Sequence, residues 1–116
     1  METKQKEFLK KLNLAFANSE VAFILDAVTD HIEWTIVGDK IIRGKEQFAN
    51  SLKEMASSQP MKLEIRHMIT HGKEAVVEGS MITPDGKNYS FCDIYTFNGF
   101  KDPKIKEMKS YVFEIG

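Results

Sequence analysis

Asp93 is the carboxylate with the most unusual setting in this sequence. It lies in a segment where Tyr89, Phe91, Asp93 and Tyr95 occupy every second position. Alternate side chains of a strand share one face, so Asp93 shares its face with aromatic rings. Burial there would raise the pKa of the carboxyl group and suit it to act as a general base or a neutral hydrogen-bond donor. Asp93 is therefore a candidate catalytic residue; the alternative is a structural acid satisfied by a tyrosine or a backbone amide.

Two more acid–base groups surround the single tryptophan. His31, Glu33 and Thr35 share one face of a predicted strand, and Trp34 lies on the other. Glu33 with His31, or either group with Asp93 across a cavity, could transfer protons to and from a ligand. For His31 the alternative is a solvated position at the strand entry. We expect Trp34 to form a pocket wall.

The other reactive side chains do not form a recognisable centre. His67 and His71 lie in an alternating segment, where four residues span ~13 Å, whereas zinc–nitrogen bonds are ~2.1 Å. They cannot share one ion, and we predict no metal site. Which way His67 faces stays open, because a bulge would reverse it. The lone cysteine, Cys92, alternates away from Asp93 and is predicted to be a structural thiol.

Composition fits one small soluble domain. The chain has 116 residues, 42% hydrophobic and 28% charged, with a net charge of −1. This charge gives no general attraction to nucleic acid or anionic membranes. The start of the chain is charged and lacks the apolar run of a signal peptide, and no stretch reaches the ~20 apolar residues of a membrane span. We expect one domain over residues 1–116 and a cytoplasmic location.

The first half of the chain predicts helices and one strand. Apolar residues at helical spacing predict an amphipathic helix over 3–17 and a short second helix with Val28 among its inward residues. A β-branched and aromatic run over 31–37 predicts a strand that Gly38-Asp39 ends. A third helix is predicted over 44–57.

The second half predicts four long strands, at about 61–71, 74–83, 87–98 and 104–115. Asp-Gly and Asn-Gly are strong hairpin signals, so these strands should pair as an antiparallel meander. Helices followed by strands indicate an α+β fold, and long twisted strands favour a curved sheet around the helices. Helices cover one sheet face only, and the strands are apolar on both. We therefore expect a homodimer through the outer face.

Three segments resemble the SnoaL-like, or nuclear transport factor 2-like, superfamily that includes ketosteroid isomerase. Residues 28–38 (VTDHIEWTIVG) resemble its aspartate, tryptophan strand and glycine, and 43–48 (RGKEQF) resembles its entry into the third helix. Residues 93–97 and 104–111 resemble its last hairpin. The similarity covers roughly residues 5–115. It implies a cone-shaped fold around an apolar pocket, usually in a homodimer, with chemistry that needs no cofactor.

The resemblance also bears on catalysis. Asp93 aligns with the aspartic acid that ketosteroid isomerase keeps protonated in its oxyanion hole. The general base would fall on Thr35, which is far too weak a base, and the oxyanion tyrosine would fall around Lys11 or Leu12. Steroid isomerisation by that mechanism is therefore not expected.

These observations lead to one leading hypothesis and two alternatives. The leading hypothesis is a cone pocket that binds a small hydrophobic molecule, with Asp93, helped by Glu33 or His31, in cyclisation, isomerisation or dehydration. The alternatives are a non-catalytic ligand-binding or scaffold protein, and a protein-transport adaptor. The predicted ligand-binding residues are Trp34, Thr35, Val77, Met81, Tyr89, Phe91, Tyr95, Met108 and Val112.

Overall fold

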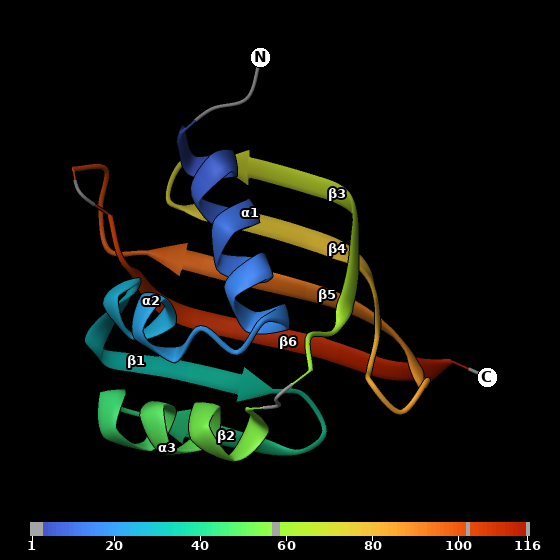
Figure 1. The fold of residues 1–116 in the computed structure, drawn as a ribbon. Coiled ribbons are helices and arrows are strands. Elements are labelled where there is room, and N and C mark those ends of the chain that lie inside the picture. The colour runs from blue at the N-terminus through green and yellow to red at the C-terminus, as the bar shows by residue number, and fades with distance from the viewer. Residues whose placement is uncertain (1–3, 57–58, 102, 116) are drawn as a thin grey trace.

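Three helices pack against a curved six-stranded sheet (Figure 1). The computed structural model describes residues 4–56, 59–101 and 103–115. The elements are α1 (Lys4–Ala17), α2 (Val21–Asp26), β1 (Val28–Ile36), β2 (Lys40–Arg43), α3 (Lys45–Met55), β3 (Lys62–His71), β4 (Glu74–Ile82), β5 (Asn88–Phe97) and β6 (Ile105–Ile115). Among these described helices, none is long and apolar enough to cross a membrane.

The sheet is mainly antiparallel, with strand order β2-β1-β6-β5-β4-β3. The exception is the pair β1 and β6, which run parallel because the helices and the long meander intervene between them. In Figure 1, α1 crosses over the meander while α3 lies beside β1 and β2. The predicted α+β class, with helices packed in a curved, mainly antiparallel sheet, is confirmed.

The predicted strands of the meander agree with the observed ones to within about two residues. Their turns lie where the glycine signals placed them, and Gly72 and Gly86 both have positive φ, 60° and 86°. In the first half, the predicted third helix over 44–57 is observed as α3 over Lys45–Met55, and residue 57 lies outside the described residues. The other difference is the boundary between the second helix and the first strand. β1 already begins at Val28, so the short second helix ends at Asp26 and Val28 is a strand residue.

The core lies between the helices and the inner face of the sheet. Leu9 and Leu12 of α1, Ile32 of β1, Phe48 of α3 and Tyr95 of β5 are all at most 1% exposed. Burying a large apolar side chain stabilises the fold by about 1.5–3 kcal/mol. The inner residues of the middle strands are thus fixed by packing, which also orients the polar side chains that alternate with them.

A β-bulge in β3 decides which way its polar residues point. The β3–β4 register shifts between Ile65 and His67, so Arg66 and His67 are both exposed and Met68 returns inward. Gly79 of β4 lies opposite, where a Cβ atom would come 2.0 Å from the carbonyl oxygen of Glu64. Only glycine allows the two backbones to approach this closely.

Replacing Gly79 by alanine should therefore destabilise the β3–β4 pair. Backbone cannot yield as a flexible side chain would, so we expect Gly79→Ala to lower the unfolding free energy by about 1–3 kcal/mol in urea titrations. Gly99→Ala is the control, because a Cβ there meets nothing within 4 Å. Equal stability of the two variants would contradict the close approach.

Candidate functional site

A cavity of about 580 Å³ lies between the helices and the inner face of the sheet. Its walls come from all three helices and from β1, β3, β4, β5 and β6, and they are mostly apolar. The lining residues are Asn13, Phe16, Ala17, Ser19, Val21, Ile24, Trp34, Ile36, Asp39, Leu52, Met55, Met61, Leu63, Met81, Tyr89, Phe91, Asp93, Met108, Ser110 and Val112. The size and the apolar walls are those of a small-molecule site.

Asp93 is the acid on the inner wall of this cavity. Its carboxylate accepts a hydrogen bond from the hydroxyl of Tyr95 (3.3 Å) and another from Ser110, its cross-strand partner on β6. The side chain is only half-buried by area because it borders the cavity. Burial raises the pKa of Asp93 to about 6, although the hydrogen bonds from Ser110 and Tyr95 act in the opposite direction.

The hydrogen bonds continue from Asp93 to β1 and α1. The indole Nε1–H of Trp34 donates to Ser110 Oγ (2.8 Å), which leaves the Ser110 hydroxyl proton for Asp93. On the other side, Asn13 donates from Nδ2 to Tyr95 Oη (3.4 Å) and to the carbonyl oxygen of Leu9 (2.8 Å). Burial raises the pKa of Tyr95 well above its usual value, so its hydroxyl remains a donor at neutral pH. Asp93 is thus held by two fixed neutral donors.

Aromatic side chains form the wall next to this network. The ring of Trp34 lies 5.9 Å from that of Phe16 and 5.6 Å from that of Phe48, as measured between centroids. Rings at such distances pack favourably and limit one another's movement. The cavity therefore combines a preformed aromatic wall with one carboxyl group on the adjoining strand.

Most of the predicted pocket residues do face the cavity. Asp93 lines it as expected from its alternation with aromatic residues. Six of the nine predicted ligand-binding residues also line it: Trp34, Met81, Tyr89, Phe91, Met108 and Val112.

Val77 and Tyr95 occupy the predicted face of the sheet but not the cavity wall. They are 0% and 1% exposed, respectively, and belong to the packed core. Asn13 of α1 reaches Tyr95 directly, so the helices fill this part of the inner face. Val77 and Tyr95 therefore do not border the cavity, where the prediction placed a ligand, and Tyr95 acts on the cavity only through Asp93.

The predicted helpers of Asp93 on β1 face the wrong side of the sheet. Trp34 and Ile36 line the cavity, so Glu33 and Thr35 alternate to the outer face and neither lines it. Glu33 lies 3.8 Å from Arg43 in an exposed ion pair, and His31 is exposed. His31, Glu33 and Thr35 thus lie away from the cavity in which they were expected to act, because alternation alone did not say which face of β1 is inward.

Sequence reasoning missed two members of the network, Asn13 and Ser110. Both are buried polar residues among apolar ones. Asn13 follows Leu9 by one helical turn, and Ser110 alternates with Met108 and Val112. Each is a polar residue at a position where the helical or strand pattern calls for an apolar one, and this signal could have identified both.

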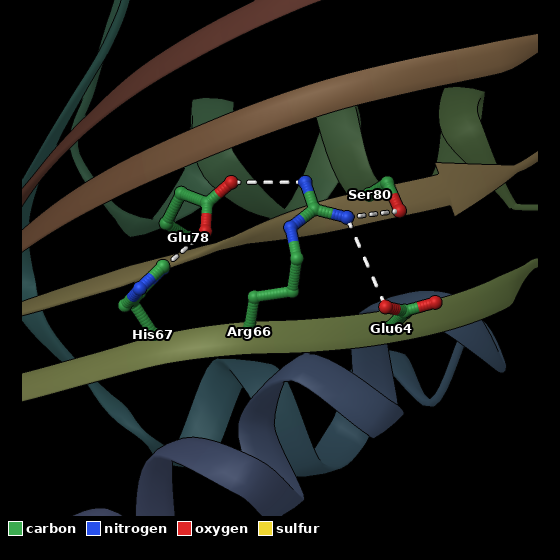
Figure 2. A network of polar contacts seen from close by, with 5 residues as sticks. All are labelled: Glu64, Arg66, His67, Glu78 and Ser80. Carbon is green, nitrogen blue, oxygen red and sulfur yellow. Dashed lines mark hydrogen bonds and ion pairs between the residues drawn. The ribbon is translucent and has the colours of Figure 1, made fainter.

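A separate polar cluster occupies the outer face of β3 and β4 (Figure 2). Glu78 accepts one hydrogen bond from Arg66 (2.9 Å) and contacts His67 Nδ1 (2.8 Å). Arg66 also donates to Ser80 (3.0 Å) and lies 3.9 Å from Glu64. Hydrogen bonds from His67 and Arg66 lower the pKa of Glu78. The bulge thus directs His67 away from the cavity and into this cluster.

Metal ligation and thiol chemistry find no support in the part of the chain described. No group of three His, Cys, Asp or Glu side chains there could hold a metal ion. Cys92 faces outward between Glu78 and Tyr111, its cross-strand partners. Burial raises the pKa of the Cys92 thiol, so it stays protonated at neutral pH and is a poor nucleophile.

The helices packed in a curved sheet around an apolar cavity define a protein of the nuclear transport factor 2-like fold. The SnoaL-like domain matches residues 9–108, and the chain belongs to this SnoaL-like family. Among curated proteins, none matches this chain.

Solved structures agree on the fold. A nuclear transport factor 2-like protein of unknown function from Cytophaga hutchinsonii is 27% identical, with 92% of this chain and 97% of that chain covered and a TM-score of 0.66. Nuclear transport factor 2 from Cryptosporidium parvum is 16% identical (93% and 90% covered, TM-score 0.79). An epoxide hydrolase from Mycobacterium tuberculosis is 17% identical (92% and 80% covered, TM-score 0.75). At these low identities, the last two structures show that the fold is shared and say nothing about function.

The raised pKa of Asp93 predicts how stability varies with pH. The folded state holds its proton up to about pH 6, whereas the unfolded chain loses it near 3.8, so folding stability falls as pH rises through this window. Asp93→Asn removes this loss. We expect it to be more stable than wild type by up to about 3 kcal/mol at pH 7.5 and by only about 0.5 kcal/mol at pH 4, in urea titrations at both values.

Asp39→Asn is the matched control, because Asp39 also lines the cavity but is exposed. A stability difference between Asp93→Asn and wild type that is the same at both pH values would contradict a buried, proton-holding Asp93.

Proposed function

We propose that this protein binds a small, mostly apolar molecule in the cavity and holds its polar group at Asp93. The observation that carries the proposal is the cavity itself: about 580 Å³ of space with Asp93 hydrogen-bonded on its inner wall. Phe91, Met108 and Val112 line the same cavity on the inner faces of β5 and β6. Apolar walls supply affinity for the body of the ligand, and a single polar group fixes its orientation.

The same carboxyl is suited to proton transfer without a cofactor. A general base works best when its pKa lies near the working pH, and the pKa of Asp93 is about 6. Tyr95 and Ser110 restrict the orientation of the carboxyl before a ligand arrives. This arrangement supports an isomerisation, cyclisation or dehydration in which Asp93 removes or returns one proton.

A second candidate function, ligand binding without turnover, rests on the inner face of β1. Trp34 and Ile36 are its residues on the cavity, so β1 offers no second acid–base group beside Asp93. Tyr95 does not help as an acid–base group, because its raised pKa keeps it protonated. A reaction that needs two such groups at once would have to use Asp39, which lines the cavity but is exposed.

Filling the cavity should abolish ligand binding. Met81 lines the cavity on β4, whereas its neighbour Ile82 is exposed on the opposite side of the strand. In a thermal-shift screen of aromatic polyketides, steroids and terpenoids, a ligand at a hundred times its dissociation constant stabilises by about 2.7 kcal/mol, a shift of several degrees. We expect hits with wild type and Ile82→Trp, and none with Met81→Trp. The absence of any hit with wild type, or the same hits with Met81→Trp, would contradict binding in the cavity.

We also propose that two copies pair through the outer face of the sheet. This face exposes large apolar side chains that the helices do not cover, among them Ile69 at 60% and Phe113 at 64% exposure. The apolar surface continues from Ile69 to its cross-strand partner Val76, and from Val76 to its partner Ile94. Exposed apolar surface of this kind supports association, and a second copy carries the same surface.

A charged residue in this surface should separate the copies. We expect wild type to show twice the chain mass of 13.3 kDa by light scattering, and Phe113→Glu to show a single chain mass. Leu14→Glu is the control, since Leu14 is a comparably exposed residue on α1. A wild-type protein of single chain mass at micromolar concentration would contradict the proposal.

A further inference from the structure

The ionisable side chains of the cavity are all acidic. Asp93 on the inner wall and Asp39 at the edge are its two carboxyl groups, and none of the described lining residues is lysine, arginine or histidine. An anionic ligand would therefore find no cation to pair with and would face two acids. Like charges brought together at an interface are a strong means of rejecting a wrong ligand.

Asp93 has only neutral partners, whereas several carboxylates on the surface have basic ones. On the surface, Glu78 pairs with Arg66 at 2.9 Å, and Asp30 lies 3.6 Å from Lys45. Glu33 and Asp26 likewise have basic partners, Arg43 and Lys104, both at 3.8 Å. None of the described residues supplies a counter-ion to the partly buried carboxyl of Asp93, and burying an unpaired charge is costly.

Asp93 keeps hydrogen-bond acceptor positions that a ligand in the cavity could use. A carboxylate offers about four acceptor positions. The hydroxyls of Tyr95 and Ser110 use two of them. At neutral pH the remaining acceptor positions of the carboxylate require a hydrogen-bond donor. A ketone or ester ligand could use Asp93 only after the carboxyl had taken up a proton, whereas an ammonium group donates directly and brings the missing positive charge.

The aromatic wall favours the same ligand. Trp34 and Asp93 both hydrogen-bond to the hydroxyl of Ser110. The ring of Phe16 packs on that of Trp34, with 5.9 Å between the centroids. Tyr89 and Phe91 line the cavity from the strand of Asp93. Aromatic faces attract cations, most strongly where water is excluded.

We infer that the cavity is selective for hydrophobic amines, whose ammonium group pairs with the Asp93 carboxylate while the apolar body packs against the aromatic wall. This inference rests on the proposed function, since it names the class of molecule that the same cavity takes. It excludes fatty acids and other apolar anions as ligands of the site.

Charge pairing at Asp93 gives amine binding a defined dependence on pH. The groups around the carboxyl are Tyr95 on β5, Ser110 on β6, Val77 on β4 and, one bond further out, Trp34 on β1 and Asn13 on α1. None of them is a base that could substitute for the ligand's charge. With the pKa of Asp93 at about 6, the carboxylate is about 9% populated at pH 5 and about 99% at pH 8. Amine affinity should therefore rise about tenfold between these values.

The test compares three probes with one skeleton: 2-naphthylmethylamine, 2-naphthalenemethanol and 2-naphthoate. Titration calorimetry at pH 8 should give the amine at least ~10-fold tighter binding than the alcohol, because a charge-assisted hydrogen bond is roughly twice as strong as a neutral one. The naphthoate should show no binding. At pH 5 the advantage of the amine over the alcohol should fall by about tenfold.

Two variants identify the group responsible. Asp93→Asn should remove the advantage of the amine over the alcohol at pH 8, and Glu33→Gln should change it by less than ~3-fold, because Glu33 lies outside the cavity in an exposed ion pair with Arg43. Equal affinities of amine and alcohol in wild type at pH 8, or tighter binding of the naphthoate, would overturn the charge selectivity and leave cavity binding intact. If none of the three binds wild type, both this inference and the proposed function fail.

Discussion

A carboxyl group on the inner face of β5 must be satisfied in a place where water is scarce and no basic side chain is present. The chain meets this constraint with two neutral donors, Tyr95 and Ser110. Each donor is itself held, Tyr95 by Asn13 of α1 and Ser110 by Trp34 of β1. Satisfying one acid thus connects a helix to three strands.

The same constraint shapes the cavity. Because Trp34 must reach Ser110, its indole lies on the inner face, where Phe16 and Phe48 pack against it. Because Tyr95 lies under α1, it belongs to the core and leaves Asp93 as the polar group of the wall between β4 and β6. Hydrogen bonds of this kind contribute modestly to net stability, but leaving any of their buried atoms unpaired costs about 1–3 kcal/mol. The network is therefore a strong constraint on the positions of all its members.

Local patterns in the sequence were enough to predict the meander of β3 to β6 and the setting of Asp93. Turn signals such as Asp85-Gly86 ended the strands, and strict alternation placed Asp93 with Tyr89 and Phe91. Both are short-range properties, fixed by turn geometry and the pleat of a strand.

Long-range packing decided what sequence patterns could not. Alternation in β1 separated Trp34 from Glu33 and His31, but only the pairing with β6 and the position of α3 made Trp34 the inward residue. The bulge at Arg66 depends on the close approach of Gly79 on the neighbouring strand, so it left no local mark. Likewise, whether Tyr95 lines a cavity or fills the core depends on how far α1 reaches over β5, which no strand period encodes.

The most direct measurement is the titration of the Asp93 carboxyl carbon by NMR, with Asp93→Asn used to assign its signal. The structure predicts a midpoint at about pH 6, well above the ordinary aspartate value of about 3.8, because burial outweighs the hydrogen bonds of Ser110 and Tyr95. A midpoint at or below 4 would contradict the account. It would mean that water or an unseen cation reaches Asp93, and that the cavity does not hold a carboxyl in need of a partner.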